Sequence, residues 1–238
     1  MNNLNEHLKA ELLAHGADVV SFGALTELPP EARDNLPVGV CVAVKYPKEV
    51  IRGITMLPTA DYFSWYNRLN ERLDMLVTLG AAFLQCLGYR AVAQTRARVG
   101  MGEDNDSTDL PHKTVATRAG LGWIGKCALL VTKEYGSMIR LSSILTDAPL
   151  KTAQSVNTSR CGDCTACTHA CPGKAVTGKL WHVGMPREAF FDAAACREAA
   201  RERARLGFGG GATICGKCIE VCPYTQKYLK AACSERFD

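Results

Sequence analysis

The sequence predicts an α+β protein in which a region of mixed helix and strand is followed by a smaller cysteine-rich domain. Three observations carry this prediction. Helical and extended apolar patterns alternate over residues 1–150. Eight of the twelve cysteines lie within residues 161–222, and a polar stretch, Lys151–Ser159, separates the two regions. We therefore expect two domains, residues 1–156 and residues 157–238.

The first elements follow from apolar spacing. Residues 3–15 have the pattern of a short amphipathic helix, and the apolar runs Asp18–Leu25 and Val38–Tyr46 are typical of buried strands. The strongest helix follows Thr59, because leucine and phenylalanine then recur at three- and four-residue steps and share one face. Gly88 is the expected end of this helix.

The rest of the first domain continues the alternation. Proline is favoured in the first turn of a helix, so the next helix is expected to begin at Pro111. Glycines concentrate in Ala119–Lys126 and indicate a turn. The other expected elements are a strand at Tyr89–Thr95, an acidic loop at Gly102–Asp109, and strands at Cys127–Val131 and Met138–Thr146.

Composition and charge limit the class of protein. No stretch approaches 18 consecutive apolar residues and the N-terminus is polar, so we expect a cytoplasmic protein without a signal peptide. The formal net charge is +4, and residues 157–238 supply it with 12 Lys and Arg against 8 Asp and Glu. Deprotonated cysteines of the same region, where they bind metal, carry negative charge that would offset this excess. The basic balance therefore does not predict nucleic-acid binding.

The cysteine spacing predicts two interlocked [4Fe–4S] clusters. In the run C-x2-C-x2-C-x3-C-P at residues 161–172, three thiolates bind one cubane and the fourth binds the other. The second run, residues 215–223, is one cysteine short of a full repeat, and Cys196 can supply the missing thiolate. Cluster one is then expected to use Cys161, Cys164, Cys167 and Cys222, and cluster two Cys171, Cys196, Cys215 and Cys218.

Two other interpretations of these cysteines were weighed. Paired C-x2-C units also form tetrahedral zinc sites, but zinc does not call for two runs that each end in Cys-Pro. Clusters can also serve as a staple for a small domain. Two adjacent clusters favour an electron relay over a staple.

A glycine-rich segment, His112–Lys126, combines a helix, a tight turn and flanking cations. Glycine lets the backbone approach a large planar or phosphorylated ligand, so a cofactor site is one interpretation, and a simple turn is the other. The pattern is not G-x-G-x-x-G before a helix, which disfavours a dinucleotide site. The candidate cofactor-binding residues are His112, Lys113, Gly120, Gly122, Trp123, Gly125 and Lys126.

Acidic residues precede this segment, and a reduction needs protons as well as electrons. Asp106 and Asp109 are the candidate proton donors, while a solvated loop is the simpler interpretation. Further along, the arginines of residues 197–205 alternate with Glu198 and Glu202 at helical spacing. This pattern is typical of an exposed, ion-paired helix face.

Several of these segments together resemble epoxyqueuosine reductase, a cobalamin-dependent family that modifies tRNA. They are Ala119–Lys126, Leu145-Thr-Asp147, and the two cysteine runs with Cys196 between them, and the similarity extends over roughly residues 10–228. The resemblance implies a nitroreductase-like N-terminal domain and a bacterial-ferredoxin-like domain whose two clusters feed electrons to cobalt. It also implies that the glycine-rich turn borders the cofactor cavity. Reductive dehalogenases are relatives.

Three departures limit what the resemblance implies. Gln94 stands where the family has its catalytic aspartate, so the proton donor is missing or moved. A Y-A-R-G-x-D-Y-H-like stretch is reduced to Ala60–Phe63, and the chain ends soon after Cys222, where the family continues into a helical-repeat domain that helps hold tRNA. We therefore expect a shorter relative that does not bind tRNA specifically and does not reduce epoxyqueuosine.

The predicted function is an iron–sulfur oxidoreductase whose clusters pass electrons to a cofactor, expected to be a corrinoid (cobalamin), and thence to a small substrate. A flavin such as FMN in the same cavity is one alternative. A non-enzymatic electron carrier or activator for a redox partner is another. The expected partners are an electron donor such as ferredoxin or flavodoxin and a second copy of the chain, because nitroreductase folds often dimerise; no membrane partner is expected.

Overall fold

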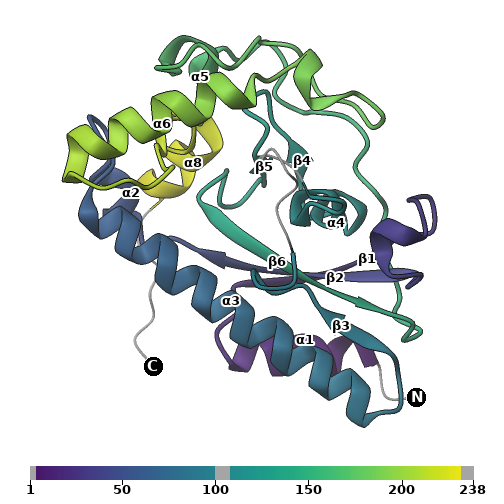
Figure 1. The fold of residues 1–238 in the computed structure, drawn as a ribbon. Coiled ribbons are helices and arrows are strands. Elements are labelled where there is room, and N and C mark those ends of the chain that lie inside the picture. Colours follow the sequence, from purple (N-terminus) through teal and green to yellow (C-terminus); the bar gives the residue numbers. More distant parts are fainter. Residues whose placement is uncertain (1–3, 100–107, 232–238) are drawn as a thin grey trace.

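A computed structural model describes residues 4–99 and 108–231. Its centre is a four-stranded antiparallel sheet in the order β1-β2-β6-β3 (Figure 1). In the central pairs, Val40 of β2 lies opposite Phe22 of β1 and Ile144 of β6. The strands are β1 (Val19–Ala24), β2 (Val38–Lys45), β3 (Ala91–Ala93) and β6 (Ile139–Thr146).

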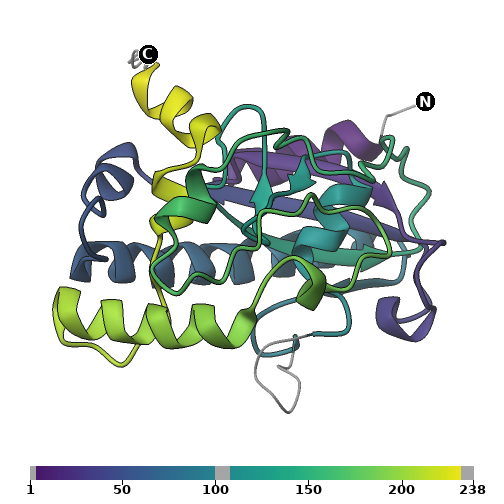
Figure 2. The ribbon, with the colours of Figure 1, turned by 90° about the horizontal axis from the view of Figure 1, so that it is seen from above.

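Helices cover both faces of the sheet, as Figures 1 and 2 show. The helices α1 (Leu4–Ala14) and α3 (Ala60–Cys86) pack on one face, and α4 (His112–Arg118) packs on the other. Side chains of a strand alternate between faces, so Val42 of β2 joins the core beneath α3 while Ala43 joins the core beneath α4. This double burial explains why β2 is a continuous apolar run.

The helix ends agree closely with the sequence prediction. Thr59 caps α3 by accepting a hydrogen bond on Oγ1 from the backbone N–H of Tyr62 at 3.1 Å. Gly88, which follows the last turn, has a φ of +88°, a conformation that favours glycine. Pro111 lies one residue before α4 as its N-terminal cap, so the helix begins at His112.

The glycine-rich turn forms more structure than the sequence predicts. Residues Trp123–Ile124 are strand β4, which pairs with β5 (Leu130–Val131) in a two-stranded hairpin. The strand expected from Cys127 onward therefore starts three residues later. The reason is local, because Ala128 adopts a φ of +60° and donates its N–H to the carbonyl of Gly125, which makes these residues the turn of the hairpin.

The remaining helices that the structure describes are α2 (Lys48–Arg52), which lies between β2 and α3, and four that follow β6, namely α5 (Ala166–Ala170), α6 (Ala193–Phe208), α7 (Lys217–Glu220) and α8 (Pro223–Lys230), with 3-10 turns at η1 (Glu31–Arg33) and η2 (Arg187–Ala189). In α6, Asp192 caps the N-terminus by accepting a bond from the N–H of Ala195, and Gly209 ends the helix in a left-handed conformation. Across the described residues, no helix is long and apolar enough to cross a membrane.

The two regions that the sequence separates share one core. Ala204, Ile219 and Leu229, from α6, α7 and α8, belong to the same buried cluster as the inner faces of α1 and α3. The polar stretch between the regions is also tied to the first one, because Ala153 donates its N–H to the carbonyl of Phe22. The linker is thus a packed part of the molecule.

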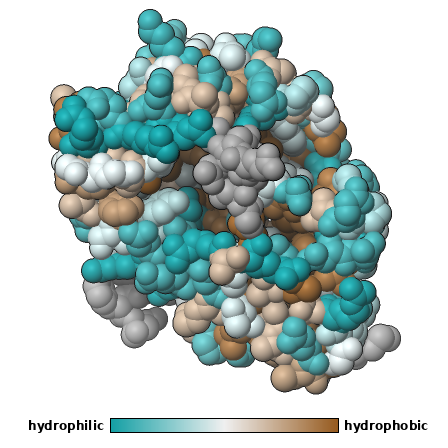
Figure 3. All heavy atoms as spheres, viewed as in Figure 1, coloured by the Kyte–Doolittle hydropathy of each residue, from teal (hydrophilic) through white to brown (hydrophobic). Residues whose placement is uncertain are grey.

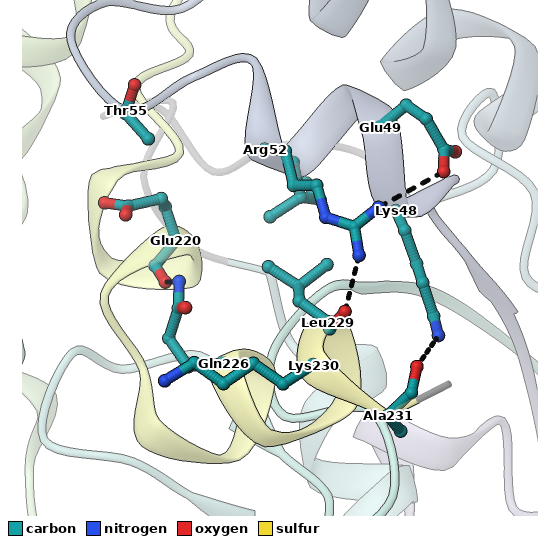
Figure 4. Close-up of a pocket in the computed structure, with 10 residues that line it drawn as sticks. Lys48, Glu49, Arg52, Thr55, Glu220, Gln226, Leu229, Lys230 and Ala231 are labelled. Carbon is teal, nitrogen blue, oxygen red and sulfur yellow. Dashed lines mark hydrogen bonds and ion pairs between the residues drawn. The ribbon is translucent and has the colours of Figure 1, made fainter. Parts of the chain in front are cut away.

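The C-terminal end of α8 lies beside α2, and the two helices border a groove (Figure 4). Arg52 and Lys48 of α2 donate to the carbonyls of Leu229 and Ala231 respectively, at the C-terminal end of α8. The last carbonyls of a helix lack partners within it, and they carry partial negative charge. The two cations therefore stabilise α8 and hold it on the first region.

Candidate redox site

The glycine-rich hairpin packs against the first cysteine run. The indole N–H of Trp123 donates to Sγ of Cys161 at 3.4 Å, and Nζ of Lys126 donates to the carbonyl of Cys164 at 2.9 Å. No side chain fits at Gly122, because a Cβ there would collide with the backbone carbonyl of Val131 in the paired strand. The hairpin thus holds Trp123 and Lys126 in fixed positions beside the cysteines.

Cys127, at the turn of the hairpin, lies between the two cysteine runs. Its side chain is only 5% exposed. Its side chain lies close to Cys167 of α5 and to Cys218 of α7, and these two helices pack on each other. The fold therefore brings one cysteine from each run to the same place.

The other cysteines of the predicted clusters are also gathered in this region. Cys161 and Cys222 flank a small buried cluster that contains Trp123. Sγ of Cys171 accepts the backbone N–H of Ala175 at 3.3 Å. Just after Cys171, a Cβ at Gly173 would lie 2.6 Å from the carbonyl of Ala195, the residue before Cys196.

No group of three His, Cys, Asp or Glu side chains among the described residues is arranged to hold a single metal ion. A cubane differs from such a site, because each of its four thiolates binds a different iron atom. The assignment of individual cysteines to each cluster stays a prediction.

A large cavity lies next to the cysteines, with a volume of about 620 Å³. Figure 3 shows that this face of the molecule is hollowed near its centre and has apolar residues inside. Ala128, which follows Cys127, and Ile219, which follows Cys218, both line the cavity. Its other walls come from α3 (Tyr66, Asn70, Leu73, Asp74), from the segment after β3 (Gln94, Arg96, Val99), from α4 and the residues before it (Thr108, Pro111, His112, Lys113), from β5 and the residue before it (Leu129, Leu130), and from β6 and the segment before it (Ser137, Ile139, Arg140, Leu141, Ser142).

The cations that line the cavity are engaged by the protein itself. Lys113 donates from Nζ to the carbonyl of Ala128 at 2.9 Å, and burial lowers the pKa of its amine. Arg140 donates twice to Oδ1 of Asn70, at 3.0 and 2.8 Å, and its guanidinium lies 4.2 Å from the centre of the Tyr66 ring. These interactions hold both cations in fixed positions at the cavity wall.

Three buried polar atoms of the cavity lining have no hydrogen-bond partner. They are Nδ2 of Asn70, Oγ1 of Thr108 and Oγ of Ser137. A buried donor or acceptor without a partner costs about 1–3 kcal/mol. The lining therefore combines polar with apolar side chains, which suits a ligand that has both kinds of group.

The structure brings two of the seven candidate cofactor-binding residues, His112 and Lys113, to this cavity. Gly120, Gly122 and Trp123 line a separate hollow of about 390 Å³. Lys126 packs on the first cysteine run, and a Cβ at Gly125 would lie 3.6 Å from Sγ of Cys161. The hairpin is the reason for this split, because it carries the glycine-rich turn away from α4 and toward the cysteines.

Among the described residues, no candidate proton donor lines the cavity. Asp109 is exposed and does not line the cavity, and Asp106 lies outside the described residues. Gln94, at the position matched to the family's acid, does line the cavity. Its side-chain amide donates to Oδ2 of Asp34 at 3.4 Å.

Sequence reasoning missed most of the cavity wall. Tyr66, Asn70 and Asp74 stand at four-residue steps on α3, which places them on one side of the helix. This polar stripe beside the apolar face of α3 was a readable signal. Arg140, on β6, gave none, because only the folded sheet brings it to Asn70.

Comparison with known proteins identifies the cysteine-rich part and supports the resemblance. Residues 160–225 match a family described as a 4Fe-4S double cluster binding domain, which confirms the expectation of two clusters for that domain. The chain is 36% identical over 127 residues to an epoxyqueuosine reductase of Synechococcus sp. (strain RCC307), covering 53% of this chain and 38% of that protein. The chain is also 32% identical over 132 residues to the epoxyqueuosine reductase of Escherichia coli (strain K12), covering 56% of this chain and 34% of that protein.

Solved structures with the same fold include two classes of enzyme. The catabolic reductive dehalogenase NpRdhA superposes with a TM-score of 0.72 at 18% identity, covering 92% of this chain and 31% of that one. An epoxyqueuosine reductase solved with an epoxyqueuosine-modified tRNA stem loop superposes with a TM-score of 0.61 at 20% identity, covering 94% of this chain and 65% of that one. The resemblance to epoxyqueuosine reductases is thereby confirmed, and the chain spans well under half of the curated relatives it matches.

Proposed function

We propose that this protein is a reductase in which two [4Fe–4S] clusters deliver electrons to a corrinoid bound in the large cavity. The observation that carries the proposal is the position of this large cavity, with polar and apolar side chains in its lining, directly beside the cysteines. Ala128 and Ile219 line the cavity, and each follows a cysteine of the contact formed by Cys127, Cys167 and Cys218. Electrons would therefore have a short path to a bound group.

The wall chemistry favours a corrinoid over a flavin. A corrin ring is edged with neutral carboxamides, which suit the polar side chains of Asn70, Thr108 and Ser137 in the cavity lining. FMN ends in a doubly charged phosphate, whereas cobalamin carries one singly charged phosphodiester, and both Lys113 and Arg140 already donate to protein acceptors. A corrinoid would supply cobalt that becomes a strong nucleophile in its lowest oxidation state.

The residues of this chain would orient the bound group and keep it dry. Leu129 and Ile139 present apolar side chains to the cavity and exclude water from one side. His112 is held by Ser143 and adds no charge at neutral pH, because burial lowers its pKa to about 4. The nitroreductase-like character of residues 1–156 and the domain boundary near residue 157 are part of this proposal.

Protons would come from the segment that precedes α4. Asp106 and Asp109 are the two acidic candidates in this segment. Asp106→Asn and Asp109→Asn are compared under saturating reductant. Slower turnover in one variant alone would identify that residue as the proton donor, and unchanged turnover in both would exclude the segment.

The proposed substrate is a small organic molecule. A second candidate is epoxyqueuosine in tRNA, which the sequence similarity to epoxyqueuosine reductases favours. The absence of a matched acid at Gln94 opposes it. A direct assay of both substrate classes with chemically reduced, corrinoid-loaded protein would decide between them.

Cofactor binding tests the proposal directly. Anaerobic, cluster-loaded protein is titrated with cobalamin and, separately, with FMN, and binding is followed by absorption. We expect cobalamin to bind, and Asn70→Leu to weaken binding about tenfold by removing a polar partner. Thr78→Val, at an exposed site on the same helix, is the matched control. Binding of FMN alone would support the flavin alternative, and binding of neither would support an electron carrier.

A further inference from the structure

We infer that Trp123 raises the reduction potential of the cluster that includes Cys161, by donating its indole N–H to the thiolate sulfur. The inference rests on the proposed iron–sulfur function. The nitrogen lies 3.4 Å from Sγ of Cys161, and the side chain of Trp123 is 1% exposed. An indole N–H can only donate, so a sulfur acceptor satisfies it.

The surroundings of Trp123 fix the direction of this donor. The backbone of Trp123 pairs with Val131 in the hairpin. The Tyr224 ring meets the indole edge-to-face at 5.0 Å, and Tyr224 lies two residues after Cys222, the fourth expected ligand of the same cluster. The hydrogen bond is therefore built into the fold and does not depend on a flexible side chain.

The sign of the effect follows from charge. Reduction adds one negative charge to the cluster, and part of that charge falls on the ligand sulfurs. A donor aimed at a sulfur stabilises the reduced form more than the oxidised form, and hydrogen bonds to sulfur are one of the factors that set cluster potentials. The guanidinium of Arg160, 6.0 Å from the centre of the indole ring, acts in the same direction.

Trp123→Phe removes the N–H and keeps most of the ring. Cluster potentials are measured by anaerobic redox titration with electron paramagnetic resonance detection. We expect one of the two clusters to become harder to reduce, with about a fivefold change in its ratio of oxidised to reduced form at a fixed potential, the size of one ordinary hydrogen bond. The other cluster should keep its potential.

Trp181→Phe is the matched control, because Trp181 is a buried tryptophan in a separate apolar cluster. It should leave both potentials unchanged. If Trp123→Phe is unstable, replacing Trp123 by benzothienylalanine keeps the ring shape and exchanges only the N–H for sulfur. Two cluster signals with unaltered potentials in either of the two Trp123 variants would overturn the inference. The absence of cluster signals in the wild-type protein would instead overturn the proposed function.

Discussion

His112 Nδ1 lies 2.9 Å from Oγ of Ser143, and this hydrogen bond joins the first turn of α4 to the middle of β6 at the cavity wall. Burial lowers the pKa of the imidazole from 6.5 to about 4, and the nearby Arg140 acts in the same direction. The folded protein therefore keeps His112 neutral over a range in which an unfolded chain would protonate it.

The first prediction is a loss of stability in acid that depends on His112. Between pH 6.5 and pH 4 the unfolded chain binds a proton that the folded chain does not, so stability falls as the pH drops through this window. The full loss is about 3 kcal/mol. His112→Gln should flatten this slope in urea denaturation between pH 8 and 5.5. His15→Gln, at an exposed position, should leave the slope as in the wild type.

The second prediction concerns Cys196, the only expected ligand outside the two cysteine runs. Anaerobically prepared wild-type protein should hold about eight irons and eight sulfides, as two cubanes require. Cys196→Ala should remove or convert one cluster and spare the other. Cys41→Ala, at a buried cysteine of β2, should keep the full iron content. Unchanged iron content and resonance spectrum in Cys196→Ala would show that another residue completes the second cluster.

How far the sequence predicted this molecule depends on whether a feature is local. The strands β1 and β2 and the helix α3 follow from side-chain periodicity, which a short segment carries by itself. The two-residue strand β4 depends on its pairing with β5, so the sequence indicated only a turn. The cysteine runs were predicted for the same local reason, since their spacing is itself the signal.

The cavity was predicted less well because its residues meet only through tertiary packing. Asn70 of α3 and Arg140 of β6 are 70 positions apart in sequence and bond each other across the cavity wall. The glycine-rich segment allows two interpretations from its sequence, a cofactor site or a simple turn, and neither one predicts that Trp123 bonds Cys161. Short-range patterns identified Trp123 as a candidate residue but not the partner that it contacts, and they identified neither Asn70 nor Arg140.

The third prediction concerns Arg118, a charged side chain that is 2% exposed. It donates to Oε1 of Glu27 at 2.6 Å, to the carbonyl of Val156 at 3.0 Å and to Oδ1 of Asn157 at 2.6 Å, and so ties α4 to the linker. Arg118→Met should lower the free energy of unfolding by about 2–3 kcal/mol, because each bond to a charged group contributes and Val156 loses its partner.

Urea denaturation of the anaerobic protein measures this change. Glu27→Gln is the comparison, since the Glu27 side chain is 55% exposed and its carboxylate remains hydrated without Arg118. A loss below about 1 kcal/mol is expected for it. Equal losses in the two variants would mean that the ion pair with Glu27, rather than the linker contacts, provides the stability.

The last prediction is that the chain does not bind tRNA tightly by itself. Nucleic-acid affinity comes largely from phosphate neutralisation and therefore falls steeply with salt. Residues 1–156 hold 16 basic and 16 acidic side chains, and the most basic helix, α6, pairs Arg205 with Glu202 at 2.7 and 2.8 Å. Fluorescence anisotropy with a tRNA-Tyr stem loop at physiological ionic strength should give weak binding, with the same affinity for a scrambled stem loop. Submicromolar, salt-sensitive binding that prefers the epoxyqueuosine-modified loop would contradict this and would make tRNA the leading substrate.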